Sequence, residues 1–123
     1  MDLDEEDALW KRLREFGPSS EIHPHPSGQL ACTDGVRYLV EHYDLGSIVD
    51  VIAASQPRAR TDPDLREFQL WELRRCGKQR FAVCSRTVDD EAFRLDVSRS
   101  ATRLPYLRLY AQSGILMLPS EHS

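Results

Sequence analysis

Residues 33–56, TDGVRYLVEHYDLGSIVDVIAASQ, constrain the fold of this chain more than any other segment. Thr33 and Asp34 have side-chain oxygens that accept hydrogen bonds from the first turn of a helix, so we expect a helix to begin there. Apolar residues then recur three and four positions apart, which predicts an amphipathic helix over 34–43. Its buried stripe is expected to consist of Val36, Leu39, Val40 and Tyr43.

Two further helices are predicted near this segment. Gly46 separates the helix over 34–43 from a short helix over 47–55, whose apolar residues face inward. Residues 4–16 also form an amphipathic pattern, with an acidic first turn that suits the positive end of a helix dipole. The apolar stripe of this first helix is Leu9, Leu13 and Phe16. Gly17 and Pro18 are expected to end it.

Two segments are expected to lack regular structure. Residues 17–31, GPSSEIHPHPSGQLA, contain three prolines and two glycines. The residue before each proline is disfavoured in the α region, so this segment is predicted to be an extended loop. Pro57 is expected to end the helical half of the chain, and residues 57–65 are predicted to form a polar loop.

The second half of the chain favours strands. EFQLWELRR at 67–75 and RFAVCSRT at 80–87 are rich in β-forming residues and are joined by a short turn at 76–79. A third strand follows, in which Phe93, Leu95 and Val97 alternate with polar residues. Three strands joined by tight turns predict an antiparallel meander.

The C-terminal part is predicted to hold one helix and one strand. Pro105 suits the first position of a short helix, and Gly114 suits its left-handed C-terminal cap. The apolar run 115–118, bounded by Gly114 and Pro119, is predicted to be a buried strand. The element order is then α-α-α-β-β-β-α-β. We therefore expect a single α+β domain over 1–123, with the N-terminal helices packed on a small antiparallel sheet in two layers.

The composition bears on which compartment and which kinds of partner are expected for this protein. The chain has 123 residues, 41% hydrophobic, with no apolar run as long as the ~20 residues that a membrane span needs, so no membrane partner is expected. The acidic start differs from the basic start of a leader sequence, which favours the cytoplasm. Cys32, Cys76 and Cys84 are an odd number and are expected to be reduced thiols, although a Cys76–Cys84 bridge is conceivable.

The charge distribution is uneven. The formal net charge is −4, yet arginines gather at 58–60, at 74–75 and across 99–108. A domain that binds nucleic acid usually carries a strongly basic face. Nucleic acid therefore remains an alternative partner for the arginine surface but is not favoured.

Three motifs resemble those of an uncharacterised family of small domains from phages, plasmids and bacterial genomes. They are TDGVRYLVEHYDLGSIVDVIAASQ (33–56), FQLWEL (68–73) and LYAQSGILMLPSE (109–121). In that family a TDGV-type helix start is followed by an FQ-x-W-x-L strand and a terminal glycine-hydrophobic-LPSE segment. The match is expected to span roughly residues 33–121. The resemblance implies a frequent place on mobile elements, and it supplies no catalytic residues.

No residue pattern predicts a reaction. His23, His25, Cys32 and His42 come closest to a metal-ligand set, but only the two histidines of the His-Pro-His segment form a close pair. No serine or cysteine lies in a nucleophile signature, and the acidic residues at 89–91 are typical of a turn. We expect no catalytic residue, no cofactor and no metal. A small enzyme or metal protein centred on His23, His25 and Cys32 is the third alternative.

The acidic start of the chain is among the parts that the family resemblance covers least. Its carboxylates can imitate the phosphates of a nucleic acid and occupy a basic groove on a partner. We expect a non-enzymatic protein-binding module that contacts a host or effector protein, in its sharpest form an anti-CRISPR-like inhibitor of a defence complex. The residues expected to contact the partner are Asp4, Glu5, Glu6, Asp7, Trp10, Arg58 and Arg60.

Overall fold

The computed structural model describes residues 2–18 and 21–122 and contains helices and one seven-stranded sheet. The helices are α1 (Leu3–Leu13), α2 (Asp34–Tyr43), α3 (Gly46–Ala54), α4 (Gln56–Ala59) and α5 (Pro63–Glu67), followed near the C-terminus by the 3-10 turn η1 (Pro119–Glu121). The strands are β1 (Ile22–Pro24), β2 (Ala31–Thr33), β3 (Gln69–Cys76), β4 (Gln79–Thr87), β5 (Asp90–Asp96), β6 (Leu107–Gln112) and β7 (Ile115–Met117). The chain is an α+β protein.

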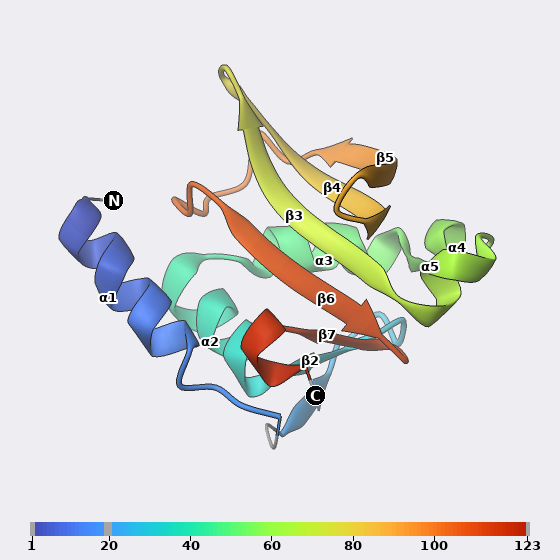
Figure 1. Ribbon diagram of the computed structural model, residues 1–123, viewed down its shortest axis with the longest axis horizontal. Coiled ribbons are helices and arrows are strands. Elements are labelled where there is room, and N and C mark those ends of the chain that lie inside the picture. The colour runs from blue at the N-terminus through green and yellow to red at the C-terminus, as the bar shows by residue number, and fades with distance from the viewer. Residues whose placement is uncertain (1, 19–20, 123) are drawn as a thin grey trace.

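The sheet has the strand order β1-β2-β7-β6-β3-β4-β5 (Figure 1). Strands β3, β4 and β5 form the predicted antiparallel meander. On the other side of β3, β6 pairs antiparallel with both β3 and β7. The pairing of β2 with β7 is parallel, so the sheet is mixed. The last strand joins the sheet as predicted, but through β6 rather than through a helix.

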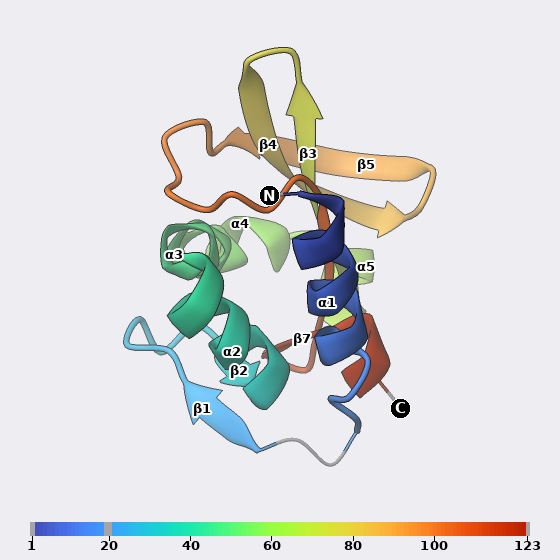
Figure 2. The same cartoon turned by 90° about the vertical axis from the view of Figure 1, so that its left-hand side faces the viewer.

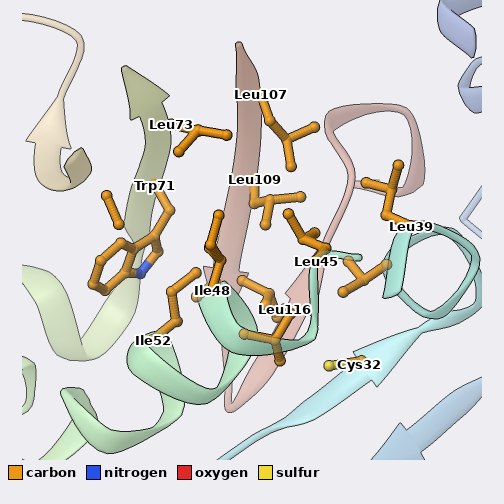
Figure 3. Close-up of a cluster of buried hydrophobic side chains, with 14 of the residues drawn as sticks. Cys32, Leu39, Leu45, Ile48, Ile52, Trp71, Leu73, Leu107, Leu109 and Leu116 are labelled. Carbon is orange, nitrogen blue, oxygen red and sulfur yellow. The ribbon is translucent and has the colours of Figure 1, made fainter. Parts of the chain in front are cut away.

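The helices α2 and α3 lie behind the strands in Figure 1 and cover one face of the sheet. Side chains from both layers meet in the core, as Figure 3 shows for Ile48 and Ile52 of α3 against Trp71 of β3 and Leu109 of β6. Trp71 is only 1% exposed. Burial of these apolar groups is the main stabilising contribution to the fold.

The first helix is held by its cap and its apolar stripe. The Asp2 side chain accepts a hydrogen bond from the Glu5 backbone N–H at 2.8 Å, which satisfies a donor of the first turn. Leu9 and Leu13 are buried. The Leu13 carbonyl accepts a hydrogen bond from the Ser120 hydroxyl at 3.0 Å, which ties the end of α1 to η1. The helix is close to its predicted range of 4–16.

The predicted helices over 34–43 and 47–55 are confirmed as α2 and α3, but Gly46 is the first residue of α3 and not a break between the two helices. Thr33 is the N-cap of α2, and its hydroxyl accepts a hydrogen bond from the Val36 N–H. Asp44 ends α2 in a left-handed conformation with φ of 54°. This turns the chain so that the fully buried Leu45 can enter the core before α3 begins.

The prediction that residues 17–31 form only a loop is wrong. Ile22, His23 and Pro24 form strand β1, which pairs antiparallel with β2. Pro24 is tolerated because β1 lies at the edge of the sheet, where one side of a strand needs no ladder hydrogen bonds. Residues 19–20 of the predicted loop lie outside the described residues.

The predicted polar loop over 57–65 is also corrected. Helices α4 and α5 occupy most of this range. Pro57 and Pro63 lie in the first turns of these helices, where a proline costs no intrahelical hydrogen bond. Asp62 caps α5 by accepting a hydrogen bond from the Asp64 N–H at 2.9 Å. Pro57 therefore lies in the first turn of α4 and does not end the helical half of the chain.

The helix predicted after Pro105 is wrong, because residues 107–112 form strand β6. Burial alternates along this strand, with Leu107, Leu109 and Ala111 buried. That is the period of a strand. Ser113 and Gly114, with φ of 55° and 76°, form the two-residue hairpin turn between β6 and β7, so Gly114 is a turn residue and not a helix cap.

Cys32 and Cys84 are buried, Cys76 is exposed, and all three are free thiols.

Within the described residues, none of the helices has the length and apolar character needed to cross a bilayer.

Candidate functional site

The acidic residues predicted to bind a partner lie on the outer side of α1. Asp4, Glu5 and Asp7 are exposed and form no ion pair with any other described residue. Glu6 accepts a hydrogen bond from Trp10 Nε1 at 3.3 Å. Because Leu9 and Leu13 face the core, the carboxylates face solvent on a helix that lies across the front of Figure 2.

A groove of about 190 Å³ runs beside Trp10. It lies between α1 and two later segments, the start of β6 and the chain around η1. The residues that line it are Trp10, Leu13, Arg14, Tyr106, Leu107, Arg108, Leu118, Pro119 and Ser120. Tyr106 remains 40% exposed at its rim. The groove is thus lined by two aromatic rings, of Trp10 and Tyr106, and by two guanidinium groups, of Arg14 and Arg108.

The floor of this region is held by the carboxylate of Glu72 on β3. Although Glu72 is only 4% exposed, its oxygens accept hydrogen bonds from the Tyr106 hydroxyl at 2.8 Å, from Arg74 at 2.5 Å and from Arg108 at 3.2 Å. Burial raises the pKa of Glu72, but the three hydrogen bonds outweigh it and lower the pKa below its ordinary value. Glu72 therefore holds Tyr106 and Arg108, two of the residues that line the groove.

The two arginines predicted to share the partner surface lie elsewhere. Arg58 belongs to α4, which Figure 1 shows at the opposite end of the molecule from α1. Its guanidinium lies 4.2 Å from the centre of the Phe93 ring. Arg60 donates hydrogen bonds to the side chain and the carbonyl of Gln29. The structure does not bring these arginines together with the acidic residues of α1.

Three of the four residues nearest to a metal-ligand set do meet. His23, His25 and Cys32 line a cleft of about 370 Å³ between the β1 edge of the sheet and helices α2 and α3. Because His23 lies directly opposite Cys32 in the β1–β2 ladder, the two share one face of the sheet. His42 is absent from the cleft lining, and its ring contacts Tyr38 with 4.5 Å between centroids.

Each histidine of the cleft has a carboxylate partner. His23 Nε2 lies 2.7 Å from Asp34 Oδ1, and His25 Nε2 lies 2.7 Å from Asp50 Oδ1. The other ring nitrogen of His23 accepts a hydrogen bond from Arg37 at 3.0 Å. These contacts attach β1 to α2 and the following turn to α3.

A cysteine–histidine catalytic pair does not form here. Both ring nitrogens of His23 are engaged, by Asp34 and by Arg37, so neither is directed at Cys32. Burial, with a smaller contribution from the Asp50 charge, raises the pKa of Cys32 to about 11. Such a thiol stays protonated at neutral pH and is a poor nucleophile.

The TDGV and LPSE motifs meet in one buried network. Glu121 Oε1 accepts hydrogen bonds from the Thr33 hydroxyl at 2.6 Å and from the Leu118 N–H at 2.9 Å, and Oε2 accepts one from the Gly35 N–H at 3.1 Å. The C-terminal motif therefore completes the first turn of α2. Glu121 is separated from Gly35 by 86 positions and from Thr33 by 88 positions, and these contacts were not predicted from the sequence.

The FQ-x-W motif also has a structural explanation. Gln69 of β3 and Gln56 of α4 exchange two hydrogen bonds of 2.9 Å between their buried amide groups. Trp71 Nε1 donates a third to Gln69 Oε1 at 2.8 Å. The motif thus fixes α4 against the sheet.

Comparison with known families gives one result. A family model for a family of unknown function (DUF6876) matches residues 7–122. The chain belongs to this family. No curated protein and no solved structure matches the chain.

The DUF6876 match is longer than the resemblance over 33–121 predicted, because it also includes most of α1 and the His-Pro segment. Trp10, His23 and Asp34 all lie inside it, whereas Asp4, Glu5 and Glu6 precede it. In this chain Thr33, Glu121 and Gln69 have structural roles.

Proposed function

We propose that this chain is a non-enzymatic protein-binding module whose α1 surface contacts a basic face of a partner protein. The observation that carries the proposal is the group of exposed carboxylates of Asp4, Glu5 and Asp7, which form no ion pair with other described residues. Leu3, beside them, is 79% exposed. Unpaired charges of one sign attract and orient a partner of opposite charge.

The groove next to α1 supplies the apolar part of the surface. Trp10, Tyr106 and Arg108 line it, and these are the three residue types most enriched among interface residues that dominate binding energy. A partner side chain that enters the groove would be desolvated there, while the carboxylates of α1 remain at the polar rim. This is the arrangement of an apolar centre with a charged border that protein interfaces use.

The histidine cleft and the family motifs support a non-enzymatic role. His23 and His25 are engaged by Asp34 and Asp50, and the Cys32 thiol has a raised pKa. The two histidine–carboxylate contacts also contribute to the fold, because they join the β1 edge of the sheet to α2 and α3.

A sharper form of the proposal names the class of partner. The resemblance to domains on mobile elements motivates the role of an anti-defence inhibitor, similar to an anti-CRISPR protein. In this form the carboxylates of α1 take the place of nucleic-acid phosphates in the basic groove of a host effector complex. Nucleic acid and α1 would then compete for one surface of the effector.

The test is affinity capture from host lysate, with and without nuclease, followed by titration of the captured partner. The D4N/E5Q/D7N variant removes three negative charges without changing side-chain size. We expect it to lose about tenfold or more in affinity, and the wild-type affinity to fall as salt increases. The matched control is D64N/E67Q/D89N, which removes three exposed charges elsewhere.

The outcomes separate the candidate functions. A partner protein that survives nuclease treatment and depends on the α1 carboxylates supports the proposal. Equal binding by the two triple variants contradicts the assignment to α1. Capture that disappears with nuclease, and that weakens when Arg58 and Arg60 are changed, supports the nucleic-acid alternative instead.

A further inference from the structure

A second candidate site lies at the β1 edge of the sheet, where three metal-binding side chains converge. One donor atom from each of Glu21, His23 and Asp34 lies within 4.8 Å of the donor atoms of the other two. Asp34 is central: its Oδ1 lies 2.7 Å from His23 Nε2, and its Oδ2 accepts a hydrogen bond from the Glu21 N–H at 2.9 Å. The three groups come from two segments that are distant in sequence.

The strand register explains the convergence. Ile22 is paired with Thr33 in the antiparallel ladder, so Glu21 and Asp34 occupy the next opposing positions. Glu21 and His23 are two residues apart and therefore project to the same face. Asp34 begins α2 immediately after its cap, Thr33, so its position is fixed by the helix as well. The cluster is thus built on backbone that is already ordered.

The local charge favours a divalent cation. The cluster contains the carboxylates of Glu21 and Asp34, and the adjacent Arg37 pairs with the carboxylate of Glu41 at 2.8 Å. The three carboxylates and the one guanidinium leave two negative charges beside the imidazole.

We propose that Glu21, His23 and Asp34 form a binding site for a divalent transition-metal ion of the Zn²⁺ type. One imidazole nitrogen and two carboxylate oxygens are a donor set that Zn²⁺, Co²⁺ and Mn²⁺ accept. The donor atoms around a tetrahedral zinc ion lie about 3.4 Å apart, so small rotations of the exposed Glu21 and the half-buried His23 and Asp34 side chains close the site. In a tetrahedral site three protein ligands leave the fourth position to water.

Binding requires a change at His23. In the metal-free arrangement Arg37 donates to Nδ1, which places the ring proton on Nε2 beside Asp34. The metal takes Nε2, the proton moves to Nδ1, and Arg37 releases the ring while it keeps its ion pair with Glu41. The number of protons on the imidazole is unchanged. Arg37 therefore competes with the metal, and its removal strengthens binding.

The neighbouring histidine provides a matched control. His25 lines the same cleft and also pairs with a carboxylate, at 2.7 Å from Asp50. It lacks a third donor group in the described residues, because the cluster consists of Glu21, His23 and Asp34. If metal binding were a general property of exposed His–Asp pairs, His25 would contribute as much as His23.

The experiment is titration of the purified full chain with Zn²⁺ by calorimetry and with Co²⁺ by visible absorption. We expect one ion per chain, a thermal midpoint that rises with Zn²⁺ and returns with a chelator, and a Co²⁺ spectrum typical of nitrogen and oxygen ligands. H23Q and D34N should each lose about tenfold or more in affinity, whereas H25Q should stay within about twofold. R37Q should bind several-fold more tightly.

Three results would overturn the proposal. The first is a folded wild-type chain that takes up none of Zn²⁺, Co²⁺ or Mn²⁺. The second is an equal loss of affinity in H25Q and H23Q, which would indicate unspecific binding to exposed histidines. The third is weaker binding by R37Q. Circular dichroism of each variant confirms that it is folded, and D34N keeps an oxygen that can accept the hydrogen bond from the Glu21 N–H.

Discussion

Gly35 has a structural role that depends on the size of its side chain. A Cβ atom placed there would lie 2.4 Å from Leu118 Cδ1 and 2.5 Å from Glu121 Oε1. The close approach is what allows Glu121 to reach the Gly35 N–H. The glycine of the TDGV segment of this chain is therefore required by the packing of the C-terminal turn against α2.

We predict that Gly35→Ala destabilises the protein by about 2–3 kcal/mol, because the added methyl group forces Leu118 and Glu121 to move. Gly46→Ala is the matched control, since a Cβ there lies 3.8 Å from its nearest neighbour, Val40 Cγ1. It should leave stability unchanged or raise it slightly. Urea unfolding of both variants measures the difference. Equal effects would contradict the role assigned to Gly35.

Tyr106 and Glu72 supply a prediction about pH. The pKa of Glu72 is lowered in the folded state, so its contribution to stability is present above the unfolded pKa of about 4.3 and is lost as the pH falls through the folded pKa. Tyr106→Phe removes one donor and raises the pKa of Glu72. We expect it to cost about 1–2 kcal/mol at pH 7, and the cost to shrink below about pH 4.

The measurement is urea unfolding of the wild type and the variant from pH 7 to pH 3. Tyr110→Phe is the control, because the Tyr110 hydroxyl makes no hydrogen bond to any described residue while its ring contacts Phe68 with 5.1 Å between centroids. It should change stability by less than about 0.5 kcal/mol at every pH. A cost of Tyr106→Phe that did not vary with pH would argue against the ionised carboxylate as the acceptor.

At the scale of elements, the β6–β7 hairpin shows why residues 107–112 form a strand where a helix was predicted. Leu107, Leu109 and Ala111 have the spacing of a strand, whereas Leu104, Leu107, Tyr110 and Ala111 have the spacing of one helical face. The turn at Ser113 and Gly114 decides between them, because two consecutive positive φ angles form a hairpin turn that matches the twist of the strands.

We predict opposite effects of two substitutions in this turn. Gly114→Ala forces a side chain into a conformation with φ of 76° and should cost about 1 kcal/mol. Ser113→Gly, at φ of 55°, relieves the same kind of strain and should cost nothing or raise stability. Thermal unfolding of the two variants provides the test. Loss of stability in both would show that the backbone strain is not the deciding factor.

At the scale of the whole molecule, the C-terminal turn contacts two helices from the N-terminal part of the chain. Ser120 contacts α1 and Glu121 contacts α2, so η1 links the first and second helices. The sheet is ordered so that β6 and β3 are central, while β1 and β5 are edges. Stability is therefore expected to be highest in the centre of the sheet and lowest at its edges.

Hydrogen exchange tests this distribution. Backbone amides of β3, β4 and β6 should exchange slowest, through global unfolding, and those of β1 and β5 should exchange faster, through local opening. The difference in exchange rate from the central strands should be largest for β1, which has only three residues. Equal protection of the amides in all seven strands would contradict the predicted distribution of stability.

The sequence by itself determined the elements whose signals are local. Thr33 and the apolar stripe that follows it predict α2, and the alternation around Phe93 and Leu95 predicts β5, because caps and side-chain periods involve residues a few positions apart. The same local signals indicated the α+β class. They were insufficient for β1 and β6, where proline, glycine and mixed spacing suit more than one conformation.

The tertiary structure alone decided which distant residues meet. Glu121 binds at the start of α2, Gln56 pairs with Gln69, and Asp34 lies between Glu21 and His23. The sequence identified His23 and His25 as candidate ligands, but not Glu21 or Asp34. Strand register and helix docking, which are set by burial over the whole chain, bring those carboxylates within reach of the imidazole.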